Sequence, residues 1–163
     1  MKVVYVIDGW ERTGGIQNLA DDVINMSVRR GDIVRVVSLP MWIPRPLKRL
    51  IVWLRLLSCL SFDVFHSLTI LPSGFFVHEF CRTFNKRMIQ SVYGKDVLSS
   101  IKSGGLKRKR VMKILNENEI IYCSKSTRDL VKYAVKKEGL RRLGITSEVD
   151  KWMKELKDCW RRY

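Results

Sequence analysis

The sequence predicts an α/β protein in which helices cover both faces of an open, doubly wound parallel sheet. Short β-branched runs alternate five times with helix-length amphipathic segments. The first of these runs is apolar throughout, as expected for a strand that is buried on both faces. A length of 163 residues suits a single domain. We expect residues 1–145 to form this domain and residues 146–163 to form an amphipathic C-terminal helix or tail.

The first forty residues predict a βαβ unit. Residues 2–7 form its first strand, a helix follows over residues 16–30 and stops at Gly31, and residues 33–39 form the second strand. Because such crossovers are right-handed, the two strands are expected to be parallel.

The later segments continue the same alternation. The helix over residues 47–60 holds Pro46 in its first turn, Ser124 is the expected N-cap of the last helix, and Gly139 is its expected stop. Residues 104–110 are expected to form a mobile loop. Further strands are predicted over 63–66, 88–93 and 120–123. Further helices are predicted over 71–84 and 124–137, and residues 111–116 are predicted to end another helix. This order predicts a Rossmann-like fold with three layers, α/β/α.

The chain is strongly basic, with 31 Lys and Arg against 16 acids and a net charge of +15. A field of this sign attracts nucleic acid, anionic lipid headgroups or phosphorylated substrates. Basic residues concentrate at 45–55, at 102–113 and from 132 onwards, where solvated helix faces are the ordinary alternative. Nucleic-acid binding is the least favoured class, because no helix-turn-helix, zinc finger or RNP-like strand is present.

Metal binding and membrane insertion are both disfavoured. The four cysteines form no C-x-x-C pair, and neither His66 nor His78 pairs with cysteine at metal-ligand spacing. We therefore predict no metal and no cofactor. The N-terminus lacks the long apolar run of a signal peptide, and residues 47–60 are too short and too charged to span a bilayer. A cytoplasmic location follows, with peripheral contact to the inner face of the membrane as an option.

The first candidate site is the glycine pair after the first strand. Ligands of doubly wound sheets bind beyond the carboxyl ends of the strands. There, the backbone N–H groups of Gly14, Gly15 and Ile16 could approach an anion at the start of a helix, although a tight turn would use the same residues. The segment is not G-x-G-x-x-G, and residues 38–40 supply no acid for a ribose, so a dinucleotide site is disfavoured.

Six segments in order resemble family 4 glycosyltransferases of the GT-B fold: residues 1–8 (MKVVYVID), 14–19 (GGIQNL), 30–37 (RGDIVRVV), 62–66 (FDVFH), 92–97 (VYGKDV) and 121–127 (IYCSKST). The resemblance covers roughly residues 1–137. It implies a GT-B N-terminal half-domain that binds the acceptor of a retaining, hexosyltransferase-like enzyme. The 163 residues leave no room for the family's donor-binding half, so the chain is expected to be inactive alone, whether it is one subunit of a split enzyme, a truncated or degenerate relative, or a fragment.

The resemblance also implies roles for individual residues. Gly14, Gly15 and Ile16 would face the diphosphate of the nucleotide-sugar donor, while Tyr93 and Asp96 would be the catalytic residues beside the transferred sugar. Relatives usually have histidine at the position of Tyr93, and tyrosine, with an ordinary pKa of about 10, is a poor base near neutrality.

The acceptor side is assigned to residues at two later strand ends. His66, Ser67 and Ser124 are the predicted acceptor contacts, although N-capping explains Ser124 more simply. A second histidine that is common two positions after His66 is Leu68 in this chain. Two polar contacts of the family are therefore missing.

The helix over 47–60 has the cationic and aromatic composition of a surface-lying membrane helix. A core-packing helix with basic outer positions is the alternative. The predicted membrane-facing residues are Trp42, Arg45, Lys48, Arg49, Trp53 and Arg55.

The expected partners are a nucleotide-sugar donor, a lipid-linked or saccharide acceptor, a donor-domain subunit or a second copy, and an anionic membrane. The rival function is a non-catalytic basic module of the same fold that binds membrane, polysaccharide or a partner subunit.

Overall fold

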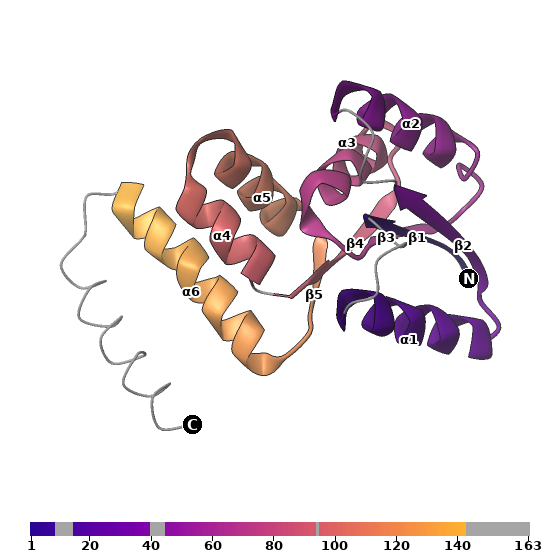
Figure 1. Cartoon of the computed structure of the whole chain (residues 1–163), viewed down its shortest axis with the longest axis horizontal. Helices are drawn as coiled ribbons and strands as arrows, with labels where there is room; N and C mark the ends of the chain where they lie inside the picture. The colour runs from indigo at the N-terminus through magenta and orange to yellow at the C-terminus, as the bar shows by residue number, and fades with distance from the viewer. Residues whose placement is uncertain (9–14, 40–44, 94, 143–163) are drawn as a thin grey trace.

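The computed structural model describes residues 1–8, 15–39, 45–93 and 95–142, and it confirms the α/β class. Five strands form one sheet in the order β2-β1-β3-β4-β5, and every neighbouring pair is parallel (Figure 1). The strands are β1 Lys2–Asp8, β2 Ile33–Leu39, β3 Val64–Ser67, β4 Arg87–Val92 and β5 Glu119–Tyr122. The strand order reverses between β1 and β3, as in a Rossmann-like sheet.

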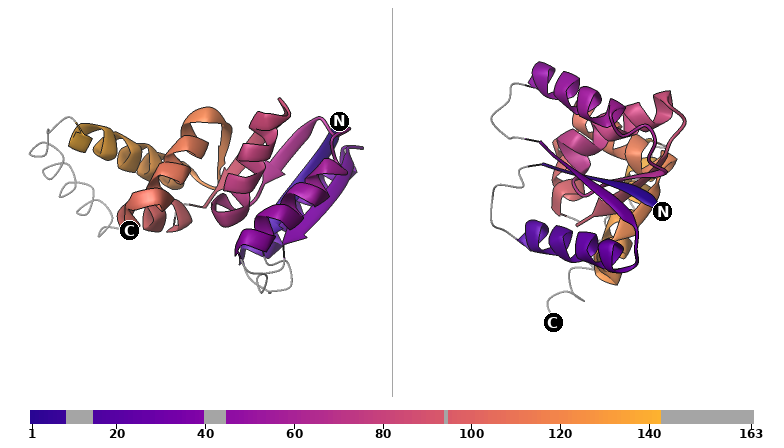
Figure 2. Two further views of the ribbon diagram at one scale, coloured as in Figure 1. Left: turned by 90° about the horizontal axis from the view of Figure 1, so that it is seen from above. Right: turned by 90° about the vertical axis from the view of Figure 1, so that its right-hand side faces the viewer.

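The helices lie on both sides of this sheet. They are α1 Gly15–Arg29, α2 Arg45–Leu57, α3 Phe75–Thr83, α4 Lys95–Ser103, α5 Gly105–Glu117 and α6 Lys125–Arg142, with a short π-helical turn, η1, at Ile70–Gly74. Figure 2 shows α1 on one face of the strands and α2 with α3 on the other. The three predicted layers are therefore present.

The core explains why β1 is apolar throughout. Val4 and Val6 pack into the cluster formed with α2 and α3, whereas Val3, Tyr5 and Ile7 pack into a second cluster beneath α1. All five are buried, because successive side chains of a strand point to opposite faces and both faces are covered.

The helix predicted over residues 71–84 begins later than expected. Leu71 has extended backbone angles (φ −139°, ψ 139°), and the regular helix α3 starts only at Phe75. Leu71 precedes Pro72, and a proline disfavours helical angles in the residue before it. The prediction overlooked this local restriction.

The mobile loop predicted at residues 104–110 is wrong, because these residues belong to α5 and to the turn before it. Gly104 and Gly105 have positive φ of 69° and 58°, and they separate α5 from α4, which was not predicted as a separate helix. Val111 and Ile114 of α5 are fully buried in a cluster with residues of α4 and α6. This burial stabilises a helix whose first turns carry mostly charged side chains.

The predicted stop at Gly139 is also wrong, because α6 continues to Arg142. A glycine inside a helix costs about 1 kcal/mol relative to alanine, which weakens a helix without ending it. The predicted boundary at residue 145 and the segment 146–163 lie outside the described residues. Within the described ranges, no helix has the length and apolar character required to cross a membrane.

Candidate functional site

The carboxyl edge of the sheet is organised around Asp8, the last residue of β1. Its Oδ2 accepts hydrogen bonds from Thr69 Oγ1 (3.1 Å) and from the backbone N–H of Ser73 (3.2 Å). The hydroxyls of Thr69 and Ser73 lie 2.6 Å apart. Asp8 therefore fixes the segment after β3 at the point where the strand order reverses. The strand was predicted to end at residue 7, and Asp8 was assigned no role; its polar character directly after a buried run was the available signal.

The predicted phosphate site is described in part. Gly14 lies outside the described residues, while Gly15 and Ile16 are the first two residues of α1. Because α1 follows the carboxyl end of β1, the positive end of its dipole lies at this edge of the sheet. A phosphate contact at this position stays a prediction.

His66 lies in the packed layer beneath α1. Its side chain is only 5% exposed, and its Nε2 lies 2.8 Å from Ser91 Oγ on β4. Its ring also contacts that of Tyr5, with a centroid distance of 5.1 Å. Burial lowers the pKa of His66 from 6.5 to about 4, so the imidazole is neutral at physiological pH. An acceptor could reach this ring only if the surrounding side chains moved.

Ser67 and its neighbours hold the turn after β3. Ser67 is fully buried, and its hydroxyl donates to the carbonyl oxygen of Thr69 (2.8 Å). Gln90 is also fully buried, and its Nε2 donates to the carbonyl oxygens of Ser67 (3.1 Å) and Ser91 (2.8 Å). A Cβ on Gly74 would lie 2.5 Å from Gln90 Oε1, so this position requires glycine. The Ser67 hydroxyl, which was predicted to bind the acceptor, is therefore hydrogen-bonded within the turn after β3.

The other predicted site residues lie at or just before the starts of the later helices. Ser124 accepts a hydrogen bond from the N–H of Thr127 (3.0 Å), which is the N-cap geometry of α6. Tyr93 is half-buried directly after β4. Asp96 lies in the first turn of α4, and its side chain is outside the described set.

On α2, the predicted membrane-facing aromatic residue packs inward. Trp53 is half-buried and meets Phe80 and Phe84 edge-on, at centroid distances of 5.8 and 6.3 Å. Arg49 lies 5.7 Å above the Trp53 ring and pairs with Glu79 on α3 (3.3 Å).

Another predicted cation, Arg55, donates a hydrogen bond to the carbonyl oxygen of Ser38 on β2. Trp42 lies outside the described residues, and the side chains of Arg45 and Lys48 are not described.

The outward face of α2 carries leucines instead. Leu47, Leu50, Leu54 and Leu57 are 52%, 56%, 57% and 39% exposed. Their spacing of three and four residues places them on one face of the helix. The membrane contact was predicted on the cations and tryptophans of this segment, and the leucines were not part of that prediction.

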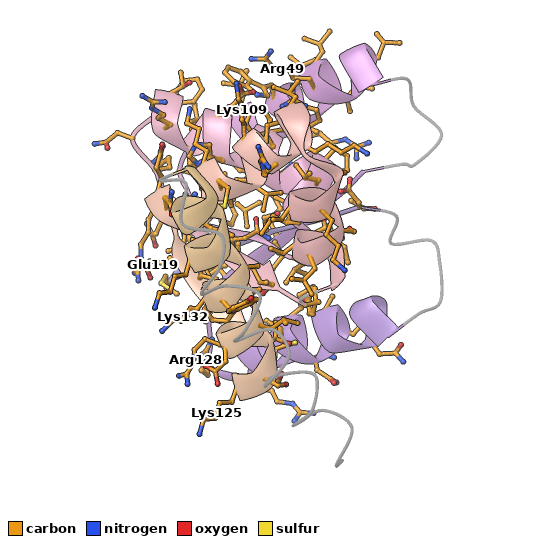
Figure 3. The ribbon with its side chains drawn as sticks, turned by 90° about the vertical axis from the view of Figure 1, so that its left-hand side faces the viewer. Arg49, Lys109, Glu119, Lys125, Arg128 and Lys132 are labelled. Atoms are coloured by element: carbon orange, nitrogen blue, oxygen red, sulfur yellow. The ribbon has the colours of Figure 1, made fainter. Side chains whose placement is uncertain are left out.

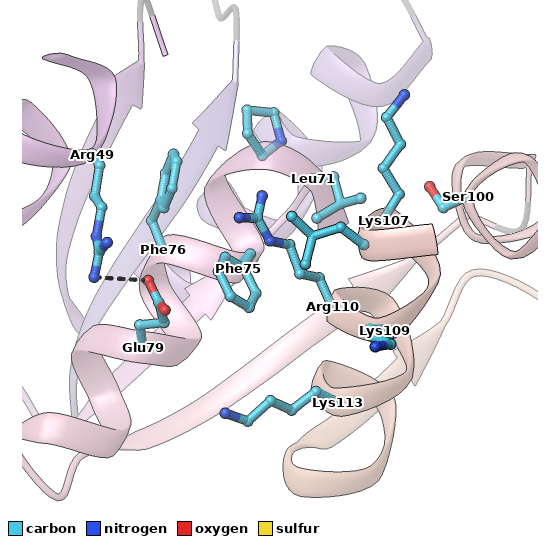
Figure 4. Close-up of a pocket in the computed structure, with 12 residues that line it drawn as sticks. Arg49, Leu71, Phe75, Phe76, Glu79, Ser100, Lys107, Lys109, Arg110 and Lys113 are labelled. Atoms are coloured by element: carbon cyan, nitrogen blue, oxygen red, sulfur yellow. Dashed lines mark ion pairs between the residues drawn. The ribbon is translucent and has the colours of Figure 1, made fainter. Parts of the chain in front are cut away.

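A cavity of about 900 Å³ opens between α3 and α5, with Arg49 of α2 at one end (Figure 4). We call it the basic groove. Its lining is Arg49, Leu71, Pro72, Phe75, Phe76, Glu79, Ser100, Leu106, Lys107, Lys109, Arg110 and Lys113. The basic run at 102–113 was visible in the sequence, whereas the aromatic rings opposite it come from a helix about thirty residues earlier in the chain.

The cations of α6 lie apart from this groove. Figure 3 shows Lys125, Arg128 and Lys132 projecting from α6 at the opposite end of this face from Arg49 and Lys109. Among the described residues, no group of three or more His, Cys, Asp or Glu could hold a metal ion.

No protein-family model and no curated protein matches the chain significantly. The resemblance to family 4 glycosyltransferases thus depends on the six sequence segments alone.

Proposed function

We propose that these residues form the acceptor-side half of a glycosyltransferase that uses a nucleotide-sugar donor and requires a donor-binding domain for turnover. The observation that supports it most is the reversal of strand order between β1 and β3, next to the start of α1. In open α/β sheets, ligands bind in the crevice at this switch point. The six family-like segments supply the reaction class.

In this proposal the chain binds and orients its substrates. Backbone N–H groups of Gly14, Gly15 and Ile16, together with the positive end of α1, stabilise the negative charge that develops on the donor's diphosphate as the sugar leaves. Tyr93 and Asp96 border the transferred sugar. His66 is given no role as a general base, because its ring is buried and its Nε2 is bonded to Ser91, so it does not face a substrate.

The test is a titration with UDP-glucose and GDP-mannose, followed through the backbone amide signals of residues 14–17. We expect shifts in these signals, and we expect Gly15→Asp to abolish them because it places a carboxylate where the diphosphate binds. Asn18→Asp is the matched control, since it adds the same charge at an exposed position of α1. Equal binding by the Gly15→Asp variant and the wild type would refute the assignment of the loop.

A second candidate function is a non-catalytic binding module of the same fold. The burial of His66 and the tyrosine at position 93 favour it, because both positions lack an available histidine. Addition of an isolated donor-binding domain distinguishes the two functions. Transfer of a sugar in that mixture supports the enzyme, whereas saturating donor-domain binding without transfer supports the module.

We further propose that α2 contacts an anionic membrane through its leucines. Four exposed leucines on one face of α2, in a chain with a net charge of +15, suit insertion at an anionic lipid surface. Sedimentation with vesicles that contain phosphatidylglycerol tests this contact. We expect Leu50→Glu and Leu54→Glu to reduce binding, and Met26→Glu, at a similarly exposed position of α1 (57%), to leave it unchanged. Equal binding by all three variants would exclude α2 as the contact.

A further inference from the structure

We propose that the basic groove binds a small amphiphile that consists of a phosphate monoester and an apolar tail. The groove lies between helices on one face of the sheet, and its chemistry is independent of sugar transfer. It combines positive charge that no acid of the groove pairs with and an apolar lining of half-buried or buried aromatic rings and the exposed Leu106.

The charge comes from one face of α5. Lys107, Arg110 and Lys113 are three residues apart and therefore lie on neighbouring turns of one side of the helix. In Figure 4, Arg110 and Lys113 extend from α5 across the groove towards α3. The acid on the opposite wall, Glu79, is already paired with Arg49. Within the described chain, no ion pair involves the three α5 cations.

Arg110 is positioned to bind a phosphate. Its guanidinium carbon lies 4.5 Å from the centroid of the Phe75 ring, and this contact restricts its orientation. In Figure 4 the end of the guanidinium extends from α5 into the groove, where its N–H donors would make charge-assisted hydrogen bonds with a phosphate oxygen. Lys113 is half-buried on the next turn and supplies a second positive charge.

The apolar part of the groove requires more than an inorganic ion. Leu71, Phe75 and Phe76 form one wall, and Leu106, which is 61% exposed, lies opposite on α5. A volume of about 900 Å³ is much larger than a phosphate and lies in the usual range of small-molecule sites. An alkyl or prenyl chain would bury this apolar surface while its phosphate meets Arg110 and Lys113.

The first experiment measures the affinity of the full chain for hexyl phosphate by isothermal titration calorimetry at low salt. Inorganic phosphate and hexanol are the comparison ligands. We expect hexyl phosphate to bind at least about tenfold more tightly than inorganic phosphate, because the tail buries apolar area. Hexanol should bind more weakly than hexyl phosphate, because it lacks the charge. Equal affinities for hexyl phosphate and inorganic phosphate would overturn the proposal.

The second experiment tests whether the binding site is the groove. Arg110→Gln and Lys113→Gln should each weaken hexyl phosphate binding about tenfold, because each removes one charge-assisted contact. The matched control is Lys132→Gln, which removes the same charge from an exposed position on α6. Thermal unfolding shows whether each variant is folded, and Lys113→Gln decides the result if Arg110→Gln does not fold. An equal loss of affinity in the Lys132→Gln control would overturn the proposal, because the charge effect would then be delocalised.

A competition experiment distinguishes the source of the ligand. Vesicles that contain phosphatidic acid should displace hexyl phosphate if the natural ligand is a membrane lipid. Failure of the vesicles to compete, with hexyl phosphate binding intact, assigns the groove to a soluble phosphate ester. The nucleotide-sugar titration follows the amide signals of residues 14–17 and does not report on the groove. The glycosyltransferase proposal can therefore fail while hexyl phosphate still binds, and the two proposals are tested separately.

Discussion

The buried imidazole of His66 predicts a specific loss of stability in mild acid. The unfolded chain has a histidine pKa of 6.5, whereas burial lowers the folded-state pKa to about 4. Between these values the unfolded state binds more protons, so stability is complete above pH 6.5 and falls as the pH drops towards 4. For one such group, the linkage relation gives a loss of about 2 kcal/mol between pH 7.5 and pH 5.

The assay is urea unfolding of the chain at several pH values between 5 and 7.5, compared with the His66→Phe variant. The variant keeps a ring against Tyr5 but cannot bind a proton, so its stability should depend less on pH by about 2 kcal/mol over this range. The Ser91→Ala variant is the control, because it removes the hydrogen-bond partner and keeps the titrating ring. If the wild type and His66→Phe show the same dependence of stability on pH, burial does not lower the pKa of His66 as described. His66 would then be accessible enough to contact an acceptor.

Three further predictions follow from the packing at and beside the sheet. Gly74→Ala should lower the free energy of unfolding by about 2 kcal/mol, since the new methyl group would lie 2.5 Å from Gln90 Oε1 and 2.6 Å from the backbone carbonyl oxygen of Thr69. Denaturant titration measures this, and an unchanged free energy of unfolding would contradict the tight packing at Gly74. Ser124→Ala should cost about 1 kcal/mol through loss of the α6 N-cap, measurable in the same way, with an unchanged midpoint as the contrary result. Burial raises the pKa of the Cys81 thiol to about 12. Iodoacetamide at pH 8 should therefore modify exposed Cys123 and leave Cys81 intact until the chain unfolds. Peptide mass spectrometry measures the labelling, and rapid labelling of Cys81 in the native chain would contradict its burial.

The strands were predictable because their signal is local. Residues 33–39 were predicted as a strand and are β2 with the same bounds. The strand β1 is one residue longer than predicted at its end, and β5 is shifted by one residue from its predicted range. A β-branched apolar run records burial on both faces within a few consecutive positions. Helix ends were harder to predict, because glycine occurs both inside helices and in turns. Gly139 lies inside α6, whereas Gly104 and Gly105 form the turn into α5, and packing decides between the two outcomes.

The candidate site was predictable in position and much less so in detail. The carboxyl edge of the sheet followed from the alternation of elements, and Ser124 was correctly assigned to an N-cap from its place between a strand and a helix. The role of Asp8 depends on Thr69 and Ser73, which lie more than sixty residues away in the chain. No local pattern carries that information.

By itself, the sequence determined the α/β class, the strands, the excess of positive charge and the segments that carry it, because each depends on residue type and short-range spacing. Only the tertiary structure decided that His66 is closed in by Tyr5 and Ser91, that Trp53 packs inward while the α2 leucines face outward, and that Arg110 of α5 lies over Phe75 in the basic groove. These outcomes depend on which elements meet in space. Packing between segments distant in the chain sets burial, pKa and access to a ligand, and the local sequence does not specify that packing.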